Sequence, residues 1–239
     1  MGLFGSALFT GIMFISVLPY SLVVIAARLF GARASYAAII GWTRAMVWLL
    51  KKLCGLDFEV TGTQRLPADA SVALIKHSSA YETLVQMLIL PRQCWVLKRE
   101  LIWTPFLGWA LSTTHPIAIN RRAGRSAVEQ VVRQGCQRLK QGIWVTIFPE
   151  GTRMAPGQTR RYGISGVLLA QKAGRKIVPI AHNAGDYWPR RGLRKKPGTV
   201  RFVIGEPVAP TGRDLRELNE DIQRWMEATV ARLRNTPPV

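Results

Sequence analysis

His77 and Glu82, which follow a short apolar run, are the residues with the clearest potential for acid–base chemistry. A neutral imidazole can take a proton from a hydroxyl, and a carboxylate on its other nitrogen fixes the tautomer and stabilises the imidazolium. On one continuous helix, side chains five residues apart point about 140° away from each other. The pair can therefore meet only if His77 precedes a helix and Glu82 lies in its first turn.

Glu82 also has a purely structural interpretation. Ser79 and Glu82 match the S-x-x-E capping box, in which the glutamate bonds to amides at the start of a helix. On that interpretation His77 is a structural histidine. The two interpretations are compatible, because a capping glutamate in the first turn can also face the histidine.

Two further polar groups follow apolar runs. In residues 148–153, a Pro-Glu-Gly turn would expose a set of groups able to bind a phosphate or hydroxyls: Glu150, the amides of Gly151 and Thr152, and Arg153. Arg121 and Arg122 follow another apolar run and suit an anionic ligand. An ordinary turn and solvated surface charge are the alternatives.

Seven short runs rich in β-branched residues predict the strands that position these groups. The runs are 57–61, 71–76, 93–98, 116–120, 143–148, 176–181 and 199–204, and helical patterns cover 81–90, 100–111, 125–140, 164–172 and a stretch from about 213. This alternation predicts an α/β fold with a mostly parallel sheet of about seven strands flanked by helices. The carboxyl ends of parallel strands bind ligands, so the residues after each strand matter most.

An apolar segment precedes this alternation. Residues 1–27 carry no charge and would form a helix of roughly 40 Å, kinked at Pro19. A second apolar stretch, 35–50, ends before Lys51 and Lys52. We expect a retained membrane-associated segment at 1–54 and a catalytic domain at 55–239. Two full spans conflict with the positive-inside rule, which leaves one span with an interfacial helix, or a hairpin in one leaflet. Two buried helices of a soluble core are the alternative.

The chain is strongly basic, with 33 Lys and Arg against 14 Asp and Glu, a net charge of +19. This charge predicts a polyanionic partner: nucleic acid, an anionic membrane surface or a phosphorylated substrate. Residues 186–196 mix cations with Tyr187 and Trp188, which suits lipid headgroups, an acidic carrier protein or coenzyme phosphates. Neither the three cysteines nor the three histidines show metal-ligand spacing, so no metal site is expected.

The order of these motifs resembles the 1-acylglycerol-3-phosphate acyltransferase family over roughly residues 55–210. His77 with Glu82 matches its H-x-x-x-x-D motif, Arg121 its second motif, 148–153 its F-P-E-G-T-R motif, and 178–180 its V-P-I motif. This chain has Glu82 where the family usually has aspartate. His115 stands where a glycine often opens the second motif.

The resemblance implies a glycerolphosphate acyltransferase-like fold and acyl transfer from acyl-CoA or an acyl-carrier protein to the free hydroxyl of lysophosphatidate. The product would be phosphatidate, for phospholipid biosynthesis. We expect the protein at a membrane, and at the cytoplasmic face of the inner membrane if the chain is bacterial. His77 would be the general base and Glu82 its orienting partner. Arg121 and Arg122 would hold the acceptor phosphate, and 150–153 would line the acceptor site. No cofactor is implied. Another acceptor, such as a lyso-ornithine lipid, and a basic nucleic-acid-binding protein are the alternatives.

Overall fold

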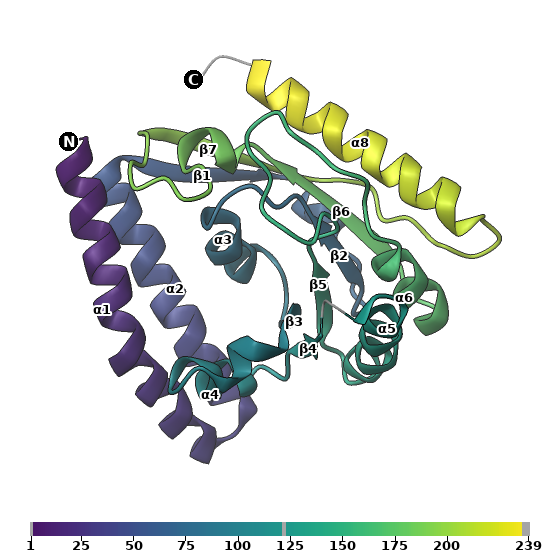
Figure 1. The fold of residues 1–239 in the computed structure, drawn as a ribbon, viewed down its shortest axis with the longest axis horizontal. Helices are drawn as coiled ribbons and strands as arrows, with labels where there is room; N and C mark the ends of the chain where they lie inside the picture. The colour runs from purple at the N-terminus through teal and green to yellow at the C-terminus, as the bar shows by residue number, and fades with distance from the viewer. Residues whose placement is uncertain (1, 121–122, 236–239) are drawn as a thin grey trace.

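A computed structural model describes residues 2–120 and 123–235. One sheet with the strand order β1-β7-β6-β2-β5-β3-β4 lies at its centre (Figure 1). All pairings are parallel except β6 with β7. The strands are β1 (Leu56–Thr61), β2 (Val72–Ile75), β3 (Gln93–Lys98), β4 (Ile117–Ile119), β5 (Trp144–Ile147), β6 (Ile177–His182) and β7 (Gly198–Ile204). The predicted fold class is confirmed.

Helices cover both faces of the sheet (Figure 1). One face carries α1 (Leu3–Ala27), α2 (Ala32–Cys54), α3 (Tyr81–Ile89) and α4 (Leu107–Ser112). The other carries α5 (Arg125–Lys140), α6 (Ser165–Ala173) and α8 (Leu215–Asn235), and α7 (Ala184–Tyr187) is one short turn. The predicted helix 100–111 is wrong. A 3-10 helix, Arg99–Trp103, ends before Thr104 and Pro105, because proline disfavours helical backbone in the residue before it.

The central strands β2, β5 and β6 are buried along their whole length. Burial on both faces explains why they are continuous apolar runs without alternation. Their carboxyl ends lie side by side because β2 pairs in parallel with both β5 and β6. The residues after these strands are therefore brought together at one edge.

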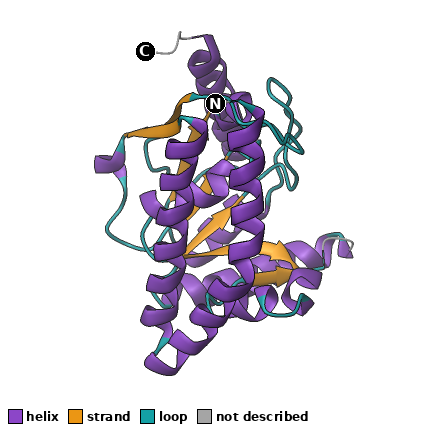
Figure 2. Cartoon of the chain, turned by 90° about the vertical axis from the view of Figure 1, so that its left-hand side faces the viewer, coloured by secondary structure: helices purple, strands orange, loops and turns teal. Residues whose placement is uncertain are grey.

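The helices α1 and α2 form an antiparallel hairpin (Figure 2). Across it, Ser35 Oγ donates to the Val24 carbonyl over 3.1 Å, and Trp42 Nε1 donates to Ser16 Oγ over 3.0 Å. Gly5 allows the closest approach, since a Cβ there would lie 2.1 Å from the Leu53 carbonyl oxygen. Pro19 lies within α1, which continues on both sides of it.

The hairpin shares the core of the sheet domain. Phe9, Met46, Val47, Leu50 and Cys54 are buried in the same hydrophobic cluster as the central strands. The division into 1–54 and 55–239 therefore stays a sequence-based prediction, while the packing joins the two segments into one body.

The outer face of α1 is apolar and exposed. Of the described helices, only the one running from Leu3 to Phe30 is long and apolar enough to cross a membrane. Since most of this helix is not covered by protein, it indicates membrane association. The exposed large side chains on α1 are Leu3, Phe4, Leu8, Phe14, Ile15, Leu18, Tyr20, Leu22 and Val23.

The composition of residues 186–196 predicts a loop whose cations and aromatic rings contact lipid headgroups, an acidic carrier protein or coenzyme phosphates, but Lys195 and Trp188 lie inside the protein. Both are buried, and the Lys195 ammonium lies 5.2 Å from the Phe9 ring centroid and 4.6 Å from that of Trp188. Its Nζ also donates to the carbonyls of Ser6 and Leu193 and to Thr10 Oγ1. Lys195 thus ties the loop to α1, and the Trp188 ring packs edge-on against Phe9.

We expect Lys195→Met to destabilise the protein, because it removes the cation–π contacts with Phe9 and Trp188 and the hydrogen bonds that the buried ammonium donates. The loss should be about 2–3 kcal/mol, or a fall in Tm of about 5–10 °C in detergent. The matched control is Lys196→Met, whose side chain is exposed. Equal Tm values for the two variants would show that Lys195 does not fasten the loop to α1.

Candidate active site

His77 lies at the carboxyl edge of the sheet, two residues beyond the end of β2 and four before α3 begins. Its Nδ1 lies 2.8 Å from Glu82 Oε1, and Glu82 is in the first turn of α3. The geometry required for the pair to meet is therefore present. The roles of His77 and Glu82 in catalysis remain predictions.

Glu82 also caps the helix. Besides His77, its Oε1 accepts the amide of Ser78 at 3.1 Å and that of Ser79 at 3.0 Å. Ser79 Oγ accepts the amide of Tyr81 over 3.0 Å. The capping and orienting interpretations thus hold together, as the sequence allowed.

The surroundings of Glu82 keep it ionised. Full burial would raise the pKa of this carboxyl, but the hydrogen bond from His77, the attraction of the His182 and His77 imidazoles and the Ser79 amide together hold it below its ordinary value. Because an ionised carboxylate only accepts hydrogen bonds, Nδ1 of His77 carries the proton. The other ring nitrogen, Nε2, is left as the proton acceptor.

The loop after β5 holds His77 from three sides. The Phe148 ring stacks on the imidazole with centroids 4.0 Å apart. The Met154 amide donates to the His77 carbonyl over 2.7 Å, and the His77 amide donates to Glu150 Oε1 over 3.4 Å. The segment 148–154 thus holds the histidine in place and is also a candidate binding turn.

Glu150 does not occupy the exposed position predicted for it. Its side chain is buried, with Oε1 3.2 Å from Nζ of the buried Lys76. Burial raises the pKa of Glu150 to about 7, against the attraction of the Lys76 ammonium. The turn pattern alone did not reveal that a lysine reaches this carboxylate from the neighbouring strand.

The other predicted binding residues lie on the same loop. Gly151 is exposed, with φ +68°, and Thr152 is half-buried. Arg153 lines a cavity beside His77, and its Nε is buried without a hydrogen-bond partner among the described residues. Arg121 and Arg122 lie outside the described residues. Their predicted binding roles, like those of residues 150–153, are not tested by the fold.

The other two histidines are explained by the main chain: His182 bonds to main-chain groups, and His115 has an unusual backbone conformation. His182 is buried at the end of β6, where its Nε2 donates to the Lys76 carbonyl over 2.7 Å and its Nδ1 accepts the Ala184 amide. Burial lowers the pKa of His182, which keeps it neutral. His115 has φ +55°, a left-handed conformation that explains why glycine suits this position.

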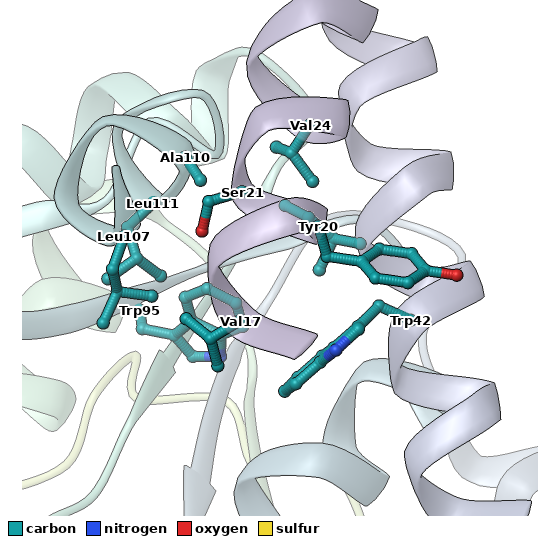
Figure 3. Close-up of a pocket in the computed structure, with 10 residues that line it drawn as sticks. Val17, Tyr20, Ser21, Val24, Trp42, Trp95, Leu107, Ala110 and Leu111 are labelled. Atoms are coloured by element: carbon teal, nitrogen blue, oxygen red, sulfur yellow. The ribbon is translucent and has the colours of Figure 1, made fainter. Parts of the chain in front are cut away.

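A cavity of about 450 Å³ opens beside His77, Phe148 and Arg153. Apart from these and a few polar groups, its lining is apolar and comes from the hairpin, α3 and β3, including Met13, Val17, Trp42, Leu84, Met87 and Val96. A smaller cavity of about 100 Å³ between α1, α2 and α4 shares Val17, Ile39, Trp42, Trp95 and Leu111 with it (Figure 3). Sequence reasoning missed these hairpin residues, because periodicity does not say what a helix faces.

Within residues 2–120 and 123–235, no group of three or more His, Cys, Asp or Glu is arranged to hold a metal ion. The site therefore consists of a held imidazole, a loop with an arginine and an apolar cavity.

Known proteins share this chain's sequence pattern. The Acyltransferase family model matches residues 57–183. The 1-acyl-sn-glycerol-3-phosphate acyltransferase of Pseudomonas aeruginosa is 42% identical over 84% of this chain and 80% of its own length. The human 1-acyl-sn-glycerol-3-phosphate acyltransferase beta is 27% identical over 87% of this chain and 76% of its own length.

A solved structure shares the fold. The crystal structure of the 1-acyl-sn-glycerophosphate acyltransferase PlsC from Thermotoga maritima matches with a TM-score of 0.80, covering 98% of this chain and 97% of the other at 20% identity. The sequence matches confirm the resemblance seen in the motifs. The chain therefore belongs to the acyltransferase family, and within it to the 1-acyl-sn-glycerol-3-phosphate acyltransferases, which are O-acyltransferases.

Proposed function

We propose that this enzyme transfers a fatty acyl chain from acyl-CoA or an acyl-carrier protein to the free hydroxyl of 1-acylglycerol 3-phosphate, giving phosphatidate. The observation that carries the proposal is the His77–Glu82 pair at the mouth of an apolar cavity. The names of the relatives support the acceptor.

The reaction needs only one general base. His77 Nε2 takes the proton of the acceptor hydroxyl as its oxygen attacks the thioester carbonyl, and the Glu82 carboxylate stabilises the imidazolium that forms. The new C–O ester bond forms, the C–S bond breaks, and the thiolate leaves with the proton from His77. No acyl-enzyme, metal or cofactor takes part.

The cavities supply a place for a fatty acyl chain. The smaller cavity, between the hairpin and α4, has an almost wholly apolar lining, and the larger one is mostly apolar away from His77 and Arg153 (Figure 3). Burying a methylene there gains about 0.8 kcal/mol. A chain lying along these side chains would place its thioester carbonyl near His77.

An acceptor phosphate needs a cation near the base. Arg153 lines the same cavity as His77, and its buried Nε–H group has no hydrogen-bond acceptor among the described residues. A guanidinium binds phosphate through paired hydrogen bonds. The proposed contribution of Arg121 and Arg122 rests on the family resemblance, and that of Gly151 and Thr152 on their place in the same turn.

The membrane supplies the acceptor and receives the product. We propose that the hairpin enters one leaflet rather than crossing it, because α1 packs along its length against α2 and α4, beside the cavity. The exposed Arg190, Arg191, Arg194 and Lys196 would face anionic lipid, each gaining about 1 kcal/mol. In a bacterium we expect the enzyme on the cytoplasmic face of the inner membrane. We propose that the net positive charge of the chain serves contact with anionic lipid rather than with nucleic acid.

The proposed base is tested by His77→Ala in a thiol-release assay with acyl-CoA or acyl-carrier protein and a panel of lysophosphatidate and lyso-ornithine lipid. We expect the parent to turn over lysophosphatidate fastest, and the variant to fold but lose about 10²–10⁴-fold or more in kcat. His115→Asn is the control, since asparagine tolerates the left-handed backbone. Near-parental turnover by His77→Ala would show that this residue is not the base. Faster turnover of lyso-ornithine lipid than of lysophosphatidate by the parent would show that lyso-ornithine lipid is the acceptor.

Glu82→Gln separates orientation of the base from helix capping. The amide oxygen can still accept the Ser78 and Ser79 amides, but the charge that stabilises the imidazolium is lost. We expect kcat to fall by about 10²-fold or more with little change in Tm. Glu82→Asp, which keeps the charge, should retain more activity. A lower Tm with unchanged kcat would leave Glu82 with capping alone.

Ser21→Leu tests the acyl cavity. Ser21 is buried and lines the smaller cavity but not the larger one (Figure 3). A leucine there should exclude the end of a long chain, so the preference for donors two methylenes shorter should rise roughly tenfold in kcat/KM. Val23→Leu, on the exposed side of α1, is the control. An unchanged preference in Ser21→Leu would mean that the acyl chain lies elsewhere.

A further inference from the structure

Lys76, the residue before His77, is a buried cation that the acyl-transfer chemistry does not use. Its side chain is 3% exposed. Its Nζ lies 2.7 Å from Glu227 Oε1, 3.2 Å from Glu150 Oε1 and 3.3 Å from the Gln158 carbonyl. An ammonium has three N–H donors, so these three acceptors satisfy it.

Lys76 and His77 connect opposite sides of the sheet. Consecutive residues at the end of a strand point to opposite faces. Accordingly His77 lines the cavity on the hairpin side, whereas Lys76 reaches Glu227 on α8. The residue next to the proposed base is therefore in direct contact with α8.

One face of α8 is devoted to the loop after β5. Asn219, Gln223 and Glu227 are spaced four apart, so they lie on one side of the helix. Asn219 Nδ2 donates to the Tyr162 carbonyl, Gln223 Oε1 accepts the Tyr162 amide, and Glu227 Oε1 accepts the Tyr162 hydroxyl over 2.6 Å. Of these three, Glu227 alone also contacts Lys76.

Stability alone does not account for such a cluster. Removing Lys76 and Glu150 from water is costly, and apolar side chains of similar volume often stabilise a core as well or better. What apolar side chains would not reproduce is the position of Glu150. Its Oε1 is shared between Lys76 Nζ and the His77 amide, so the place of one carboxylate depends on both.

We infer that Glu227 and Lys76 are positioning residues for the proposed base: α8, through Glu227 and Lys76, holds the Glu150 carboxylate where it supports the His77 main chain. Glu227 takes up part of the Lys76 charge, which keeps Glu150 from being drawn away from the His77 amide. Tyr162 fixes Glu227 in turn. The inference rests on the proposed role of His77 and adds residues outside the motifs that carry the family resemblance.

The test is Glu227→Gln, which keeps the size of the side chain and an acceptor for Tyr162 but removes the charge. We expect kcat to fall about tenfold or more, because a small displacement of a catalytic group is costly. The KM values for the acyl donor and for lysophosphatidate should stay within about twofold of the parent. Asn219→Ala is the matched control: it removes another contact of α8 with the same loop, so it should lower Tm and leave kcat within about twofold.

A second measurement needs no substrate. The His77 Nδ1 proton, hydrogen-bonded to Glu82, should give a downfield proton NMR resonance, identified by its loss in His77→Ala. We expect this resonance to move or broaden in Glu227→Gln and to stay unchanged in Asn219→Ala. A merely stabilising cluster would lower Tm in both variants without moving the resonance.

The outcomes are distinct. A kcat for Glu227→Gln within about twofold of the parent overturns the inference, and so does a lower kcat with an unchanged His77 resonance. If the parent itself turns over no lysolipid, the proposed function fails, and the resonance alone then decides whether α8 positions His77.

Discussion

The hydrogen bond between His77 Nδ1 and Glu82 Oε1 constrains the structure around it. It forms only because the backbone leaves β2, passes through five non-helical residues and enters α3 with Glu82 in the first turn. That geometry needs a buried central strand, which fixes the position of the histidine, and a capped helix, which fixes the position of the carboxylate. Glu82 Oε1 accepts the two helix-capping amides and also contacts His77 Nδ1, so one oxygen atom both caps α3 and holds the candidate base.

The second constraint is that an apolar cavity must lie beside a polar centre. The sheet alone does not provide it, because its faces are filled by its own helices. The hairpin supplies the missing wall: α2 packs into the common core through Met46 and Leu50, while Trp42 and Val17 turn toward the cavity. The outer face of α1 is apolar and exposed. A wall that is apolar on both sides suits a lipid chain inside and a lipid leaflet outside.

Sequence reasoning recovered the sheet because its signal is local. Each predicted strand ends within one residue of the observed one, since β-branched runs between turn residues report burial directly. The break at Pro105 was also visible in the sequence and was overlooked. The buried positions of Glu150, Trp188 and Lys195 were not visible, because each depends on a partner far along the chain: Lys76, Phe9 and Ser6. A basic loop and a Pro-Glu-Gly turn look solvated until the elements that cover them are placed.

The two carboxylates near His77 differ because their donors differ. Glu82 receives two backbone amides and the imidazole, which outweigh the effect of burial and keep it ionised. Glu150 has one cation, which it shares with Glu227, and one long bond from an amide, so burial dominates and its pKa rises to about 7. Environments that push paired groups apart in this way assign them different roles. The Glu82 charge lies on the Nδ1 side of the imidazole, where it favours proton transfer to Nε2. Glu150, with a pKa of about 7, accepts from the His77 main-chain amide and is only partly ionised near neutral pH.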